Sequence, residues 1–248
     1  MDGTSDEELD LFGPETASER TSIDDLLQRR RDAQRAAQEE GTLDRLAFQR
    51  RRYLQSGQHT PEALGFETLR NARPMNFGEA FSQRERQEIL ASVHAHVSAH
   101  AWTTQRHGAF PTRDIPVSAI SVADMVADRL RVMLFPRLEA HTGIDAGLWA
   151  FRDLFVVGYH EDHQRALELH SDGCLASLTL LLNDPSEFDG GGTVFEKFDL
   201  LVRQAPGDAW IHDGKLRHGG AEITRGQRVV MVAFLDTVGG ATTALAYR

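Results

Sequence analysis

The stretch Leu154–Leu182, LFVVGYHEDHQRALELHSDGCLASLTLLL, decides the fold class of this 248-residue chain. Short runs of branched and aromatic residues alternate with polar residues, a pattern typical of β-strands joined by turns. Similar runs continue almost to the end of the chain. Many short strands with polar turns predict a β-sandwich or a barrel. The expected strands are 154–160, 166–170, 174–182, 192–197, 200–204, 209–212 and 228–235.

Two of these runs carry side chains that can bind a metal. In LELHSDG, His170 and Asp172 are two residues apart, so on an extended chain they point to the same side. His218, in KLRHGG, lies far enough along for the chain to cross a sheet and return. Two imidazoles and one carboxylate form the facial triad that holds Fe(II) and leaves coordination positions open.

The strand expected at 228–235 places an arginine on an otherwise apolar face. Arg228, Val230, Val232 and Phe234 share this face because side chains alternate along a strand. A buried guanidinium is costly without an anionic partner, and its planar fork suits a carboxylate. The pattern therefore predicts that a dicarboxylate binds a metal at one end and Arg228 at the other. Each motif alone has an ordinary structural explanation, and their combined order and spacing favour this site.

The segment Leu154 to Asp236 resembles the catalytic domain of the 2-oxoglutarate/Fe(II) dioxygenases. Within the prolyl 4-hydroxylase-like superfamily it is most similar to the lysyl hydroxylase (procollagen-lysine dioxygenase) branch, because an arginine stands at 228 where prolyl 4-hydroxylases commonly have lysine. The resemblance rests on HSDG, GGGTVF, KLRHGG and RGQRVV. It implies an α+β fold with a double-stranded β-helix (jelly-roll) core and flanking N-terminal helices. It also implies that His170, Asp172 and His218 ligate iron, that Arg228 binds 2-oxoglutarate, and that Tyr159 lines the cosubstrate site.

The resemblance further implies a reaction. Fe(II), 2-oxoglutarate and O2 would together hydroxylate an unactivated C–H bond and release succinate and CO2, with a role for ascorbate left open. Asp172 stands where halogenating relatives have a small residue, which favours hydroxylation. Phe234 stands where nucleic-acid demethylases of the superfamily carry a second arginine, which argues against a nucleic-acid substrate. The expected substrate is an amino acid, free or in a peptide or protein, with a lysine-like residue favoured.

Three alternatives remain at this point. The chain could be a non-catalytic jelly-roll module that binds a metal or regulates a partner. It could be a Zn or Mn enzyme that uses no cosubstrate, or a small-molecule (natural-product) oxygenase of the same superfamily. Neither a binding module nor a cosubstrate-free enzyme needs a buried guanidinium ten residues after His218, so Arg228 separates them from the dioxygenases.

The composition limits the partners. Lys and Arg number 27 against 37 Asp and Glu, and the net charge of −10 disfavours nonspecific binding to nucleic acid or an anionic membrane. The single cysteine, Cys174, allows no internal disulfide and suits a reducing compartment. Neither a signal peptide nor a transmembrane run is evident. We therefore expect a cytoplasmic protein, with a nuclear location also open and the oligomeric state unspecified.

The chain divides by composition into three parts. Residues 1–20 are expected to be a disordered acidic tail, 21–75 a charged helical extension, and 76–248 the dioxygenase domain. Within this domain, 76–150 would supply helical support and 151–248 the jelly roll. Two scaffold helices are expected within 77–102 and 121–143 from their apolar spacing. The basic runs 29–31 and 50–52 are interpreted as solvated helix faces, and His94, His96 and His100 as non-ligands because no Glu adjoins His96.

Two loops supply candidates for substrate contact. Residues 102–117 are rich in Arg, His, aromatic residues and Pro without periodicity, which is typical of an ordered loop that lines a pocket. The loop 160–169 leads directly into the first metal-ligand motif, and carboxylates there could receive a substrate ammonium. The candidates are Arg106, His107, Arg113, Asp114, Glu161 and Asp162.

Overall fold

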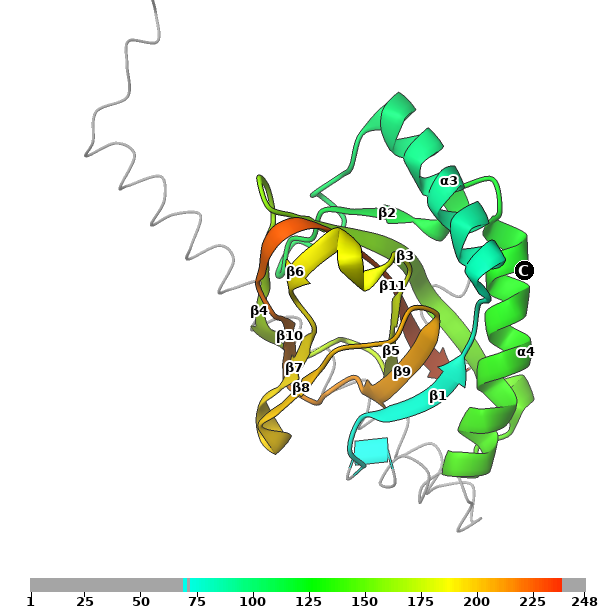
Figure 1. The fold of residues 1–248 in the computed structure, drawn as a ribbon. Helices are drawn as coiled ribbons and strands as arrows, with labels where there is room; N and C mark the ends of the chain where they lie inside the picture. Colours follow the sequence, from blue (N-terminus) through cyan, green and yellow to red (C-terminus); the bar gives the residue numbers. More distant parts are fainter. Residues whose placement is uncertain (1–68, 71, 238–248) are drawn as a thin grey trace, which may run out of the picture.

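Two antiparallel sheets and two helices form the part of the molecule described by a computed structural model, residues 69, 70 and 72–237 (Figure 1). The acidic tail predicted at 1–20, the basic runs and most of the extension predicted at 21–75 lie outside these residues. The larger sheet has the strand order β1-β9-β5-β11-β3-β2, with β6 also paired to β11, and the smaller has the order β4-β10-β7-β8. The predicted double-stranded β-helix core is confirmed.

The strands differ widely in length. β3 and β11 are long and pair with each other inside the larger sheet, whereas all four strands of the smaller sheet have three or four residues. The strands are β1 (Met75–Glu79), β2 (Asp114–Pro116), β3 (Trp149–His160), β4 (Leu167–His170), β5 (Ala176–Leu181), β6 (Phe188–Gly190), β7 (Thr193–Phe195), β8 (Leu200–Val202), β9 (Asp208–Asp213), β10 (His218–Gly220) and β11 (Ile223–Thr237). Short 3-10 turns join several of them, at η1 (Val117–Ala119), η2 (Ala146–Leu148), η3 (Pro185–Glu187) and η4 (Glu196–Phe198).

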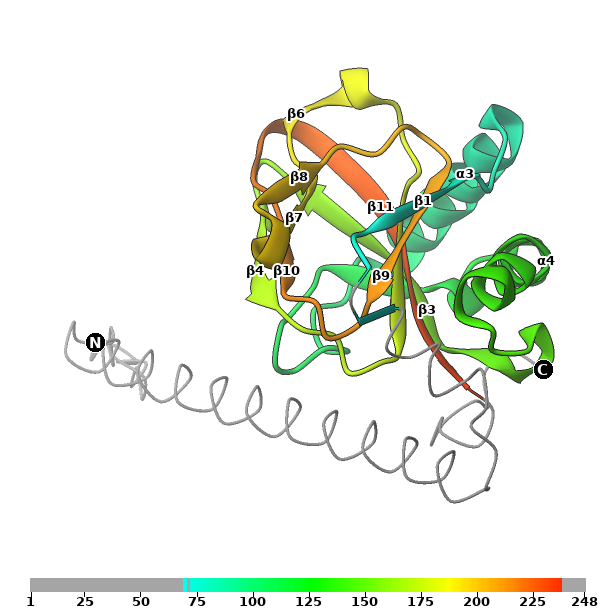
Figure 2. The ribbon, with the colours of Figure 1, turned by 90° about the horizontal axis from the view of Figure 1, so that it is seen from below.

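The larger sheet is buried on both faces, which explains the nearly continuous apolar run of β3. Figure 2 shows it as a middle layer between the smaller sheet and the helices α3 (Gln83–His100) and α4 (Ala123–Thr142). Leu154 and Val156 pack in the cluster shared with the helices, and Phe155 and Val157 belong to the cluster between the sheets. The alternation of side chains along β3 therefore divides it between a structural core and an inner chamber.

Both helices have recognisable boundaries. Ser82 caps α3, with Glu85 completing a reciprocal capping box, and Gly143 ends α4 in the left-handed conformation. The predicted helical regions 77–102 and 121–143 contain α3 and α4, but residues 77–79 belong to β1, which pairs with β9. Sequence patterns missed β1, β2, β6 and β10, which are short and contain Gly or Pro. Within the described residues, no helix is long and apolar enough to cross a membrane.

Leu134 and Val132, two residues apart on α4, test the packing of this helix on the larger sheet. Leu134 is fully buried and Val132 is 73% exposed. We expect Leu134→Ala to lower the free energy of unfolding by about 2–5 kcal/mol, because it removes buried methyl groups and leaves a cavity. Val132→Ala should change it by less than about 0.5 kcal/mol. Urea denaturation of both variants measures the difference, and equal effects would contradict this packing.

Candidate metal centre

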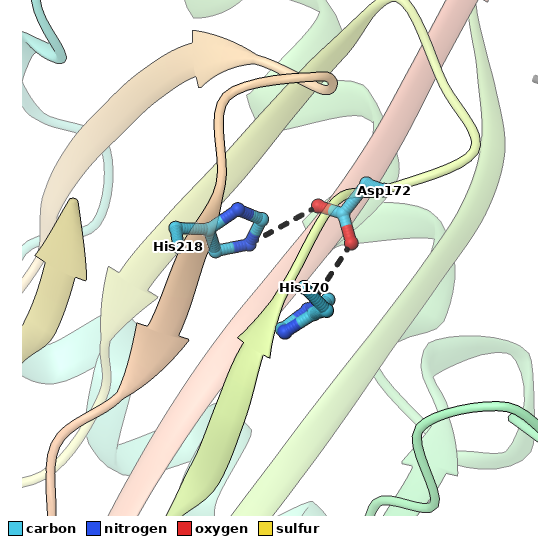
Figure 3. Close-up of side chains that lie close together, drawn as sticks. All are labelled: His170, Asp172 and His218. Atoms are coloured by element: carbon cyan, nitrogen blue, oxygen red, sulfur yellow. Dashed lines mark ion pairs between the residues drawn. The ribbon is translucent and has the colours of Figure 1, made fainter. Parts of the chain in front are cut away.

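Three side chains, two from the smaller sheet and one from the segment after β4, converge to form a potential metal site (Figure 3). His170 ends β4, Asp172 follows two residues later, and His218 begins β10, where it pairs directly with His170. Asp172 thus lies just beyond the strand end rather than within the strand. One potential ligand atom from each residue lies within 4.8 Å of the others. In the described part of the chain, no other group of His, Cys, Asp and Glu meets in this way, and His94, His96 and His100 do not.

The two imidazoles are oriented by the backbone. Nδ1 of His170 lies 2.8 Å from the carbonyl oxygen of Glu168, and Nδ1 of His218 lies 2.8 Å from that of Leu216. A carbonyl can only accept, so each Nδ1 carries the hydrogen in the neutral ring. The Nε2 lone pairs then point inward, and each Nε2 lies 3.4 Å from an oxygen of Asp172. This is how metal-binding histidines are held in proteins.

The charges within the site favour an ionised carboxylate. Burial alone would raise the pKa of Asp172, but His218 and His170 lower this pKa well below its usual range. Burial and the neighbouring His218 lower the pKa of His170. Burial opposes protonation of His218 as well, yet Asp172 raises its pKa. Two imidazoles around one buried carboxylate are a donor set that suits a divalent transition metal.

A second layer of side chains supports this donor set. The hydroxyl of Ser177, on β5, donates to Asp172 Oδ2, and the thiol of Cys174 lies 3.0 Å from the Ser177 hydroxyl. His212 packs against His218 with ring centroids 4.2 Å apart. Burial, followed by the nearby His218, lowers the pKa of His212 to about 3, so this ring is neutral. The sequence analysis did not single out Ser177 or His212, since only the strand pairing brings them to the site.

Arg228 lies on β11 and is only 2% exposed. Its Nη2 donates to Gln204 Oε1 at 3.1 Å, and its guanidinium lies 5.4 Å from the ring centroid of Tyr159, its partner on β3. Burial lowers the pKa of Arg228, but an arginine remains charged in proteins. Within residues 69, 70 and 72–237, no carboxylate forms an ion pair with it. This buried cation therefore lacks the anionic partner that its burial calls for.

Two glycines make room around Arg228 and Tyr159. Gly191 has a φ of +69°, and a Cβ atom there would lie 2.9 Å from Cδ of Arg228. A Cβ atom on Gly220 would lie 2.6 Å from the Tyr159 hydroxyl. Larger side chains at these positions would push Arg228 and Tyr159 out of place.

One cavity contains both the metal-binding triad and Arg228. The four residues predicted to share a face of β11 all line it, which confirms their common orientation. Phe155 and Val157 line it too. Because side chains alternate along a strand, their position on the same face as Tyr159 could have been predicted from the sequence. Other lining residues, such as Thr179, Thr193 and Gly219, reach the cavity through strand pairing, and the sequence did not identify them. The cavity is lined by His107, Phe110, Thr112, Phe155, Val157, Tyr159, Leu167, His170, Asp172, Thr179, Thr193, His218, Gly219, Gly220, Arg228, Val230, Val232 and Phe234.

Of the six candidates for substrate contact, only His107 lines this cavity. Arg106 instead donates to both oxygens of Asp153, at 2.7 and 2.8 Å. Arg113 lies with its guanidinium 5.0 Å from the ring of Trp102. The Asp114 carboxylate is fully buried behind the cavity wall.

The other two candidates, Glu161 and Asp162, lie in the turn after β3. Both are exposed, and neither lines the cavity. Their contact with a substrate stays a prediction.

No family model matches the chain, but individual relatives do. The multifunctional procollagen lysine hydroxylase and glycosyltransferase LH3 of Rattus norvegicus is 33% identical over 132 residues, which cover 51% of this chain and 18% of that protein. Procollagen-lysine,2-oxoglutarate 5-dioxygenase of Drosophila melanogaster is 29% identical over 133 residues, covering 52% and 18%. The chain thus spans less than a fifth of the length of these relatives.

Solved structures share the fold at low sequence identity. The viral collagen prolyl hydroxylase of Paramecium Bursaria Chlorella virus-1, in its 2OG complex, is 14% identical with a TM-score of 0.50, covering 67% of this chain and 97% of the viral one. AviO1 of Streptomyces viridochromogenes Tue57 is 14% identical with a TM-score of 0.51, covering 71% and 94%. Part of the sequence is thus similar to lysyl hydroxylases, and the fold is that of the viral prolyl hydroxylase and AviO1.

Replacing Ser177 tests whether its hydroxyl orients Asp172. We expect Ser177→Ala to weaken Fe(II) binding by about tenfold, since side chains that hold a metal ligand contribute on this scale. Ser177→Thr keeps the hydroxyl and should retain most of the affinity. Competition with a chromogenic chelator under anaerobic conditions measures both. An alanine variant that binds Fe(II) as tightly as the parent would show that Ser177 does not support the site.

Proposed function

We propose that this protein is an Fe(II)- and 2-oxoglutarate-dependent dioxygenase that hydroxylates an unactivated C–H bond and releases succinate and CO2. The observation that carries the proposal is the pairing of two features within one cavity. A His-Asp-His donor set lies in one part, and in another lies a buried guanidinium that pairs with no carboxylate of the described residues. A dicarboxylate that chelates the metal can meet both.

The residues present fit iron and 2-oxoglutarate. His170, Asp172 and His218 would hold Fe(II) through two Nε2 atoms and a carboxylate oxygen, the facial arrangement that leaves positions for other ligands. Arg228 would bind the distal carboxylate of 2-oxoglutarate. When bound, the metal and its cosubstrate supply the O2-dependent oxidation, with 2-oxoglutarate as the source of two electrons.

The chain's own contribution is orientation and exclusion of water. Gln204 fixes the direction of the Arg228 fork, and the Tyr159 ring covers one side of the guanidinium. Val230 and Val232 form an apolar floor beside the path from Arg228 to the metal. Such an enclosure strengthens the ionic contact and keeps solvent from the reacting atoms.

The proposed substrate is an amino acid, free or within a peptide or protein, or another small molecule. The similarity to procollagen lysine hydroxylases suggests a lysine side chain, whereas the structural neighbours include enzymes described as a prolyl hydroxylase and as a nogalamycin-biosynthesis epimerase. The net charge of −10 makes a nucleic-acid substrate unfavourable.

The direct test adds Fe(II) and 2-oxoglutarate to the protein without oxygen. A metal-to-ligand charge-transfer band, followed by succinate when O2 is admitted, is the expected result. Asp172→Ala should abolish the band because it removes one of three metal ligands. A protein that binds Zn or Mn but gives neither band nor succinate would instead be a cosubstrate-free enzyme or a binding module.

Arg228 and Arg225, on the same strand, provide a matched pair for the cosubstrate. We expect Arg228→Ala to raise the apparent Kd for 2-oxoglutarate by about 10- to 100-fold, as expected for losing charged hydrogen bonds in a buried site. Arg225 is exposed and paired with Asp189, so Arg225→Ala should leave that Kd within about twofold. Titration of the charge-transfer band measures both constants. Equal effects of the two substitutions would remove Arg228 from the cosubstrate site.

A further inference from the structure

We propose that the substrate end of this cavity takes an uncharged, apolar side chain and excludes the ammonium group of lysine. The inference rests on the proposed function and specifies its substrate class. It departs from the lysine preference that sequence similarity suggests, because the carboxylates near this end of the cavity are buried or already in contact with other side chains of the protein.

The pairing of the central strands locates the substrate end. On β11, the inward side chains run from Arg228 through Val230 and Val232 to Phe234, a Cα span of about 20 Å at ~3.3 Å per residue. Phe234 is paired with Ser177, the residue that donates to Asp172. The metal site therefore lies near Phe234, at one end of this row of inward side chains. Arg228 occupies the other end, so the cosubstrate approaches the metal from there.

Aromatic rings make the wall of the substrate end. The rings of Phe155 and Phe234 meet edge to face with centroids 5.2 Å apart. Phe110 lies 4.8 Å from the ring of the metal ligand His170, and His107 lies 4.6 Å from Phe155. A C–H bond presented to the metal from this side would be surrounded mainly by apolar surface.

In the part of the chain that the structure describes, no carboxylate at this end is available to a substrate ammonium. Among the described residues that line the cavity, Asp172 is the only acidic one, and it belongs to the metal site. Behind the wall, Asp114 is fully buried, and its Oδ2 accepts from Thr112 at 2.9 Å and lies 2.9 Å from His107 Nε2. The nearby Asp153 is held by both oxygens in its contact with Arg106.

The aromatic wall cannot replace the missing carboxylate, because its rings already face cations. The guanidinium of Arg106 lies 5.3 Å from the ring centroid of Phe155, and that of Arg152 lies 5.2 Å from the ring centroid of Phe234. A guanidinium therefore already makes the cation–π contact with each ring, which weakens the attraction of that ring for a second cation. Burying an ammonium without an anionic partner is strongly unfavourable, whereas burying a methyl group is favourable.

A matched pair of probes tests this inference. N-acetyl-norleucine amide and N-acetyl-lysine amide have the same unbranched four-carbon side chain. In norleucine this chain ends in a methyl group, and in lysine it carries a terminal ammonium. We expect norleucine to bind at least about tenfold more tightly, because unpaired buried charge is penalised on this scale or more. Ligand-observed NMR with the 248-residue chain loaded with diamagnetic Zn(II), with and without 2-oxoglutarate, keeps Asp172 engaged and measures binding without requiring turnover.

A new carboxylate on the cavity floor should reverse the preference. Val232 lines the cavity and is paired with Phe155, so Val232→Asp places a negative charge beside the aromatic wall. We expect this variant to bind the lysine probe better than the norleucine probe, and the isosteric Val232→Asn to show no such reversal. The wild-type comparison decides the proposal even if either variant fails to fold.

The outcomes separate this inference from the proposed function. If norleucine binds no more tightly than lysine to the wild-type protein, including the case in which neither binds, the substrate assignment is overturned. The charge-transfer band and succinate formation could still be present in that case. Conversely, selective binding of norleucine without a charge-transfer band would support the apolar site and contradict the dioxygenase.

Discussion

The pairing of β11 with β3 is the constraint on which the rest of the molecule depends. Because side chains alternate, this one pair of strands serves two purposes along its whole length. Outward residues such as Met231 and Val156 join the core beneath the helices, and inward residues such as Val230 and Val157 line the cavity. A slip of one residue would exchange the two sets and carry Arg228 out of the cavity. The fold and the site are therefore specified by the same register.

The register also explains how a guanidinium can be tolerated between two sheets. Arg228 lies over the ring of Tyr159 and is held by Gln204, which satisfies part of its hydrogen-bonding capacity but none of its charge. At the metal site the opposite sign prevails, since Asp172 is a buried carboxylate between two imidazoles. Both sites become electrically balanced when a divalent metal and a dicarboxylate are present. The unliganded cavity is thus poised for this pair of ligands.

Sequence reasoning predicted the parts of the site that depend on local spacing. The placement of Arg228, Val230, Val232 and Phe234 on one side of β11 follows from the two-residue period and is confirmed by the geometry. His170 and Asp172 also meet, but Asp172 lies beyond the end of β4, so the strand period alone does not place it. Sequence reasoning could not place Ser177, His212 or Gln204, because these residues reach the site only through pairing with distant strands. It also missed short strands such as β10, where glycines follow His218. The loop candidate Arg106 was drawn instead into an ion pair with Asp153, a residue 47 positions away.

The two ends of the cavity are subject to different physical constraints. The metal and cosubstrate end must supply fixed donors to ligands of fixed charge, so the same few residue types are needed whatever is oxidised. The substrate end has only to fit a substrate, and in this protein the charge near it is set by residues that lie behind the cavity wall. Asp114 and Asp153 could each have faced a cationic substrate, but Arg106 and His107 lie against them. Similarity at the metal end therefore carries little information about the substrate, whereas the engagement of these carboxylates within the protein argues directly for an apolar one.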